Sequence, residues 1–178
     1  VFVSKGFVTL ILHAHLPYIR HPEHEYFMEE NWLYEAITET YIPLIHVFER
    51  LERRAVPFRL TMSLTPTLIS MLQDPLLQER YIRHIGKLVE LAEKEVDRTR
   101  FQPQFHETAL YYYHEFVKAR ETFEKKFNRD LVQAFKGFQD RGRLEIITCA
   151  ATHTFLPLIN RTQSVVRSHW NATLPQSA

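Results

Sequence analysis

The sequence predicts an α/β protein in which parallel strands are joined by crossover helices. Short apolar runs rich in β-branched residues alternate with longer segments in which apolar residues recur every three or four positions. The predicted elements follow the order β, α, β, α, α, β, and no internal repeat or linker separates them. This order favours a parallel sheet with right-handed crossovers.

The first strand is predicted at residues 7–12, a nearly continuous apolar run typical of a strand that is buried on both faces. A polar loop punctuated by prolines follows it. From Asn31 to about Arg54 the apolar spacing predicts a helix. Pro43 should kink this helix, because a proline has no amide hydrogen with which to continue it.

The second strand is predicted at residues 58–64, where strand-forming residues alternate before a polar corner at Thr65 and Pro66. The next helix is predicted to begin with Asp74 as its N-cap and Pro75 at its first position. A further helical region is predicted at residues 108–138, with an interruption near residues 128–130. The third strand is predicted at residues 144–148.

Composition excludes several classes of protein. The 178 residues carry 22 basic and 21 acidic side chains, and a net charge of +1 gives no reason to expect a nucleic-acid partner. No apolar run approaches the about 20 residues of a membrane helix, so no membrane partner is expected. Cys149 is the only cysteine and no signal peptide is recognisable, so a cytoplasmic protein is expected. Nothing in the pattern indicates an oligomeric state.

Histidines lie at the ends of two predicted strands. His13 and His15 follow the first strand two residues apart, so on an extended chain their side chains point the same way. His153 follows the third strand. Ligands of parallel α/β proteins gather at the carboxyl ends of strands, so we expect these histidines to contact a ligand. The alternative is that they are core histidines bonded to backbone carbonyls.

Two kinds of ligand are compatible with the three histidines. A His-x-His pair with a distant histidine can supply three nitrogens to zinc in a metal-dependent hydrolase. Imidazoles can equally give directed hydrogen bonds to a neutral ligand, while nearby aromatic rings provide flat apolar faces, a combination that sugars need. The loop and helix after the first strand supply such rings in Tyr18, Tyr26, Trp32 and Tyr34.

Carboxylates are frequent in the same loop but have no spacing that marks an acid/base pair. They are predicted to be solvated residues of the loop and the helix start, the last of them favoured there by the helix dipole. These residues are Glu23, Glu25, Glu29 and Glu30.

Several segments together resemble the start of glycoside hydrolase family 57, specifically its 1,4-α-glucan branching enzymes. They begin with His13-Ala14-His15-Leu16-Pro17-Tyr18-Ile19-Arg20-His21-Pro22-Glu23 and continue through residues 29–44, 58–66 and 144–153. The resemblance covers roughly residues 1–167. The remaining residues, 168–178, show no helical stripe and are expected to form an atypical, unstructured tail.

The resemblance implies that the chain is the amino-terminal part of an incomplete seven-stranded (β/α) barrel. It also implies retaining chemistry on α-1,4-glucans such as amylose. A glutamate attacks the anomeric carbon, an aspartate protonates the leaving oxygen, and a glucan 6-hydroxyl completes an α-1,6 branch. No metal or other cofactor is implied.

By the same resemblance His13, His15 and His153 line the subsite around the scissile sugar, and Trp32 is a candidate for a wall of the cleft. Thr154 stands where these branching enzymes typically have glycine, which adds a side chain beside the site. The family's nucleophile and acid/base motifs are expected beyond Ala178, so the isolated chain is expected to be inactive. A metal-dependent hydrolase and a non-catalytic glucan-binding module remain as alternatives.

Overall fold

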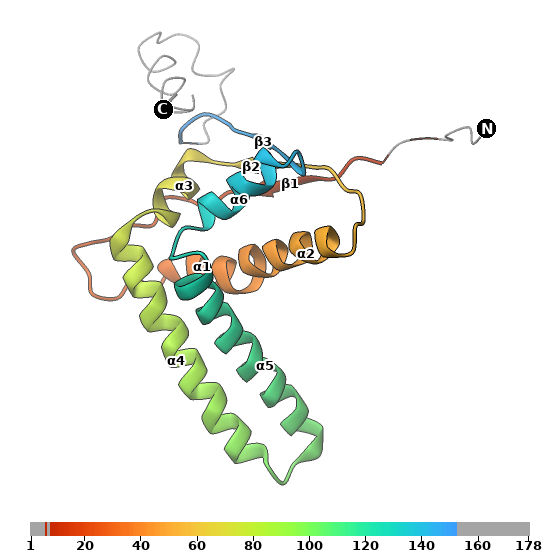
Figure 1. Cartoon of the computed structure of the whole chain (residues 1–178). Helices are drawn as coiled ribbons and strands as arrows, with labels where there is room; N and C mark the ends of the chain where they lie inside the picture. The colour runs from red at the N-terminus through yellow and green to blue at the C-terminus, as the bar shows by residue number, and fades with distance from the viewer. Residues whose placement is uncertain (1–5, 7, 153–178) are drawn as a thin grey trace.

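A computed structural model describes residue 6 and residues 8–152 of the chain, and its framework is a parallel sheet of three strands (Figure 1). The strands are β1 (Ile11–Ala14), β2 (Leu60–Leu64) and β3 (Leu144–Ile147). The α-helices are α1 (Glu30–Glu35), α2 (Ile42–Arg53), α3 (Pro66–Leu72), α4 (Pro75–Thr99), α5 (Pro103–Glu121) and α6 (Leu131–Asp140). Two π-helical segments, η1 (Ala36–Tyr41) and η2 (Thr122–Lys126), complete the described elements.

All pairings in the sheet are parallel, with β2 between β1 and β3. The register places Leu12 beside Met62 and Met62 beside Ile146. Helices lie between consecutive strands in the chain, so the predicted α/β architecture with crossover helices is confirmed.

The two faces of the sheet differ in what covers them. Leu12, Ala14, Met62, Leu64 and Leu144 belong to the hydrophobic core that the sheet forms with the helices. Side chains alternate across a strand, so the next residues along each strand point to the opposite face. That opposite face carries Ile11, His13, Thr61, Ser63, Glu145 and Ile147.

The prediction that the first strand is buried on both faces is wrong. Ile11 is 66% exposed and Leu10 is 57% exposed, because the described helices cover only the face that contains Leu12 and Ala14. The strand also lies further along the chain than residues 7–12, since it includes His13. Apolar composition indicated a strand, but it did not reveal how many layers cover it.

The kink at Pro43 stays a prediction, and this proline lies where a π-helical turn passes into an α-helix. The helix splits into α1, η1 and α2, and Pro43 falls in the first turn of α2. The wide π-helical turn of η1 comes directly before this turn. The backbone stays helical across this junction, where the Ile42 amide bonds the Ile37 carbonyl, so the missing amide hydrogen of Pro43 falls at the end of a π-helical turn.

Helix α3 is absent from the sequence-based prediction, which assigned Thr65 and Pro66 to a corner. Thr65 is the N-cap of α3, since its hydroxyl accepts from the Leu68 amide, and Pro66 occupies the first turn. The predicted cap of α4 is confirmed, because Asp74 accepts from the amides of Leu76 and Leu77 at 2.9 and 3.1 Å.

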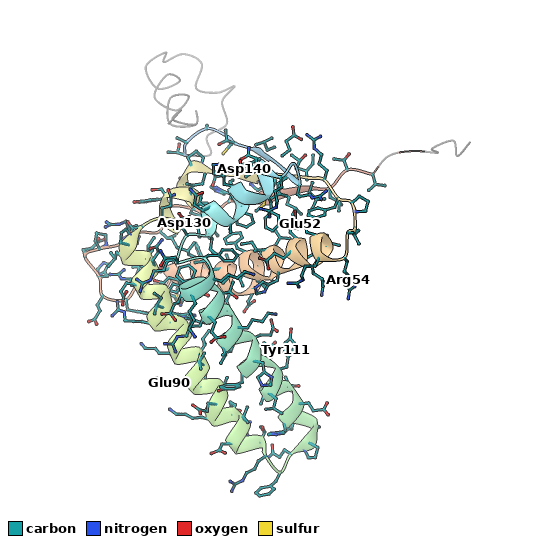
Figure 2. All side chains as sticks on the ribbon, viewed as in Figure 1. Glu52, Arg54, Glu90, Tyr111, Asp130 and Asp140 are labelled. Carbon is teal, nitrogen blue, oxygen red and sulfur yellow. The ribbon has the colours of Figure 1, made fainter. Side chains whose placement is uncertain are left out.

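Helices α4 and α5 form a long hairpin that extends away from the sheet (Figure 1). Glu90 on α4 and Tyr111 on α5 project outward from it (Figure 2). The helix α5 begins five residues earlier than predicted, at Pro103. The predicted interruption near 128–130 is confirmed, because Asn128 and Arg129 have φ angles of 48° and 69°.

No helix among residues 8–152 combines the length and the apolar character that crossing a membrane requires.

Two helices end in the same motif but with different residues at its left-handed position. After α6, Gly142 has a φ of 70°, and its amide bonds Gln139 while the next amide bonds Phe138. After α2, Ala55 has a φ of 53° with the equivalent two bonds. Both are Schellman motifs, which favour glycine at this position because it has no Cβ.

Reciprocal substitutions at these two positions should change stability in opposite directions. We expect Ala55→Gly to raise the free energy of unfolding and Gly142→Ala to lower it, each by about 1 kcal/mol, because a left-handed alanine is strained. No atom would lie within 4 Å of a Cβ added at Gly142, so the effect there is conformational rather than steric. Thermal melts should shift by about 2–4 °C. Shifts of the same sign in both variants would contradict this account.

Candidate functional site

The carboxyl ends of β1 and β2 bring histidines and hydroxyl groups together. His13 and Ser63 are register partners, and His13 Nδ1 lies 2.7 Å from Ser63 Oγ. His15 Nδ1 lies 3.1 Å from Thr65 Oγ1, just past the ends of the same strands. Each histidine on the first strand is therefore paired with a hydroxyl on the second.

The two imidazoles lie side by side, as their spacing in the sequence predicts. Their ring centroids are 5.9 Å apart and their planes are inclined by 33°. His15 is half-buried, whereas His13 lies on the open face of the sheet. The edge thus presents two adjacent polar rings with fixed neighbours.

Of the other predicted site residues, Trp32 is the one that falls within the described part of the chain. His153 and Thr154 lie outside the described residues, as does the predicted tail at residues 168–178. Trp32 lies in the first turn of α1 with 49% of its surface exposed. Its role as a wall of a cleft therefore stays a prediction.

Hydroxyl residues on β2 and α3 are the part of the site that sequence reasoning missed. Ser63 is 7% exposed and Thr65 is fully buried. Thr67 Oγ1 lies 3.2 Å from Thr65 Oγ1 and donates to the Leu16 carbonyl at 3.3 Å. The alternation of residues 60–64 indicated a strand, but only the register between the strands shows that hydroxyls lie opposite histidines.

The loop after β1 is attached to α3 and α4. The Ile19 amide donates to Met71 Sδ, and Arg20 Nε donates to Asp74 Oδ2 at 2.5 Å. Asp74 also caps α4 through its other oxygen, so one carboxylate joins the loop to the helix start. These contacts fix the path of the chain that leaves His15.

A buried ion pair completes this attachment. Arg80 on α4 and Glu30 on α1 are 7% and 2% exposed, and Arg80 Nη1 donates to Glu30 Oε1. Arg80 also donates to the carbonyls of His21 and His24 in the loop. Tyr34 donates to Glu30 at 2.8 Å, and burial with this carboxylate raises the pKa of Tyr34.

The prediction that Glu30 is solvated is therefore wrong. Its place in the first turn of α1 agrees with the predicted effect of the helix dipole. The carboxylate can nevertheless be buried, because Arg80 and Tyr34 donate hydrogen bonds to it. Glu23 and Glu25 are exposed, as predicted.

The chemistry available at the carboxyl edge is hydrogen bonding by imidazole rings and hydroxyls. Glu145 lies on the same open face, where it accepts from Thr61 at 3.0 Å. Among residues 8–152 no three histidine, cysteine or carboxylate side chains are grouped so that they could hold a metal ion. The predicted three-histidine metal site includes His153 and so lies partly outside this range.

A separate cavity of about 280 Å³ lies between α4 and α5. Its walls are mainly apolar and include Leu88, Leu91, Phe105, Tyr112 and Phe116. It belongs to the hairpin and has no residue in common with the carboxyl edge of the sheet.

Two further histidines are structural. His46 Nε2 lies 3.1 Å from Thr122 Oγ1, and burial together with Lys118 and Lys126 lowers the pKa of His46. His84 packs on the Tyr34 ring, and its pKa is lowered chiefly by burial. Both imidazoles are therefore stabilised in the neutral form.

The fold and the edge together define a parallel α/β protein with a polar site at the carboxyl ends of its strands. The model of glycosyl hydrolase family 57 matches residues 9–173. The chain belongs to this family.

Three comparisons identify relatives within it. The chain is 34% identical over 161 residues to the 1,4-alpha-glucan branching enzyme TK1436 of Thermococcus kodakarensis, which covers 90% of this chain. The crystal structure of the alpha-amylase AmyC from Thermotoga maritima superposes with a TM-score of 0.88 at 47% identity over 96% of this chain. The crystal structure of TK1436, in complex with glucose and additives, gives a TM-score of 0.83 at 30% identity over 95% of this chain.

The chain is much shorter than these relatives. It spans 23% of the branching enzyme sequence, 32% of the AmyC chain and 30% of the TK1436 chain in its crystal structure. The similarity to AmyC and TK1436 therefore concerns one part of each enzyme, and this part includes the histidine edge.

The buried ion pair gives a test of loop attachment. We expect Arg80→Met to lower the free energy of unfolding by about 3 to 5 kcal/mol in urea denaturation, because it leaves Glu30 buried without its partner. Arg98→Met is the matched control, since Arg98 is exposed and pairs with Glu95 on the same helix. The control substitution should lower the free energy of unfolding by less than about 1 kcal/mol. Equal losses in the two variants would show that burial of the Arg80 pair is unimportant.

The neutral histidines predict lower stability in mild acid. Because the folded pKa of His46 and His84 lies below the unfolded value of about 6.5, the unfolded state binds protons first as the pH falls. The free energy of unfolding should be highest above about pH 6.5, the unfolded pKa of histidine. It should decrease as the pH falls from about 6.5 to the folded pKa values of the two histidines. The double variant His46→Gln/His84→Gln should lose less stability than wild type between about pH 7.5 and about pH 5.5.

Proposed function

We propose that this chain is the sugar-binding portion of an α-glucan-active family 57 enzyme, with His13 and His15 binding hydroxyls of an α-1,4-glucan. The observation that carries the proposal is the pairing of two adjacent imidazoles with buried hydroxyls at the carboxyl edge of a parallel sheet. Sugars present closely spaced hydroxyls that both donate and accept, and such an edge complements them. His153 and Trp32 are proposed to complete the contact.

Branching is the activity we propose for the enzyme to which this portion belongs. Support comes from the 34% identity to TK1436, named a 1,4-alpha-glucan branching enzyme, and from the motifs at residues 13–23 and 29–44. In this proposal the histidines hold the sugar, and a glutamate and an aspartate outside this chain carry the glycosyl transfer.

Hydrolysis of α-glucan is the second candidate activity. The identity to AmyC, named an alpha-amylase, is 47% and exceeds the identity to TK1436. Both candidates use the same sugar-binding edge, so they differ in the acceptor that reacts second, a glucan hydroxyl or water.

Two alternatives from other classes have requirements of their own. A metal-dependent hydrolase using His13, His15 and His153 requires stoichiometric zinc in protein purified without chelator, lost on His13→Ala. A non-catalytic glucan-binding module requires glucan affinity and a cooperative melt, with no product under any condition.

Binding of maltooligosaccharides tests the site itself. We expect the 178-residue chain to bind maltohexaose, and His13→Ala or His15→Ala each to weaken binding by about fivefold or more, the loss expected for one hydrogen bond. His114→Ala, on the exposed surface of α5, is the control and should retain wild-type affinity. An equal loss in all three variants, or wild-type affinity in both site variants, would contradict the site.

Products from amylose test whether the proposed catalytic carboxylates lie outside this chain. We expect the isolated chain to generate neither new reducing ends nor α-1,6 branches, because the proposed carboxylates are not on it. Branches formed by the isolated chain would support branching and refute that placement. Reducing ends without branches would favour the amylase candidate.

A further inference from the structure

Thr65 is fully buried where β2 passes into α3, beside His15. Its hydroxyl oxygen accepts the Leu68 amide at 3.4 Å and so caps α3. The same oxygen lies 3.1 Å from His15 Nδ1 and 3.2 Å from Thr67 Oγ1. A single hydroxyl therefore takes part in three hydrogen bonds.

The number of protons available determines the direction of each bond. Each threonine hydroxyl has one proton, and a carbonyl oxygen can only accept. Thr67 donates its proton to the Leu16 carbonyl at 3.3 Å, so Thr67 must accept from Thr65. Thr65 then has no proton left for the imidazole. When all the bonds form together, His15 Nδ1 must donate.

We propose that Thr65 and Thr67 are positioning residues that hold neutral His15 in the tautomer protonated at Nδ1. The two lone pairs of the Thr65 hydroxyl oxygen then accept from the Leu68 amide and from His15 Nδ1–H. Every donor in this set of hydrogen bonds has an acceptor. The Nε2 atom of His15 carries a lone pair in this tautomer. In the site proposed above, on which this step rests, Nε2 accepts a hydrogen bond from a glucan hydroxyl.

His13 differs from His15 in this respect. Its Nδ1 lies 2.7 Å from Ser63 Oγ, and either atom can be the donor. The described contacts therefore set the direction of hydrogen bonding at His15 Nδ1 and leave it open for the pair of His13 and Ser63.

Thr67 is linked to His15 through the Thr65 hydroxyl, which makes it the informative residue to change. Thr67→Val keeps the shape of the side chain but removes the hydroxyl that accepts from Thr65. The Thr65 proton then becomes available to His15 Nδ1, so the tautomer should shift toward protonation at Nε2. Thr67→Ser restores a hydroxyl and should restore the wild-type tautomer.

The experiment is a long-range proton–nitrogen correlation spectrum of the full chain at about pH 8, where an imidazole of ordinary pKa is neutral. The His15 signals are assigned by their loss in His15→Gln. We expect wild type and Thr67→Ser to show protonation at Nδ1 and Thr67→Val to shift toward Nε2. Ser63→Ala is the control and should alter the His13 signals while leaving the His15 tautomer unchanged.

Several results would overturn the proposal. These are a wild-type His15 protonated at Nε2 or averaged between tautomers, and a Thr67→Val spectrum identical to wild type. A general loss of structure in Thr67→Val would appear in the signals of the other histidines and would also count against a positioning role if Thr67→Ser shared it.

Maltohexaose titration of the same variants separates this proposal from the proposed function. We expect Thr67→Val to bind about three- to tenfold more weakly and Thr67→Ser to bind like wild type. If wild type shows the Nδ1 tautomer and the Thr67→Val shift but binds no glucan, the positioning role stands and the proposed function fails. If wild type binds glucan but the tautomer does not respond to Thr67→Val, the positioning role fails and the proposed function stands.

Discussion

The buried guanidinium of Arg80 is the constraint on which the described site most depends. A charged group at 7% exposure is tolerated only if it is paired, and Arg80 is paired with Glu30 and with two carbonyls of the loop after β1. One side chain on α4 thereby holds α1 and the loop in place. The loop that leaves His15 then has a defined path, reinforced by the contact between Arg20 and Asp74.

Parallel strand pairing provides the second level of order. The register that aligns Ile11 with Thr61 also aligns His13 with Ser63, and it brings His15 close to Thr65. Each hydroxyl restricts the orientation of an imidazole beside it. Thr65 has two roles, because the oxygen that caps α3 also accepts from His15 in the arrangement that satisfies all the bonds. The hydroxyl oxygen of Thr65 therefore contributes both to the start of α3 and to the site.

Family membership and local geometry support the proposed function in different ways. The family match and the relatives relate the chain to enzymes named for action on α-glucans, over about a quarter to a third of their length. The geometry supports the proposal that this portion holds a sugar, since two imidazoles are paired with hydroxyls at one edge of the sheet. In the proposal, branching and hydrolysis differ in the acceptor that reacts second, a glucan hydroxyl or water.

The sequence by itself determined the parallel α/β architecture, the cap at Asp74, the break near residue 128 and the juxtaposition of His13 and His15. These features arise from periodicity, capping and spacing, which act over a few residues. Tertiary structure alone decided the burial of Glu30, the open face of β1 and the hydroxyl partners of the histidines. In each case the deciding partner is distant in the chain: Arg80 for Glu30, the helix layer for β1, and strand register for Ser63 and Thr65. Such partners leave no local pattern, because contact between them depends on how the elements pack.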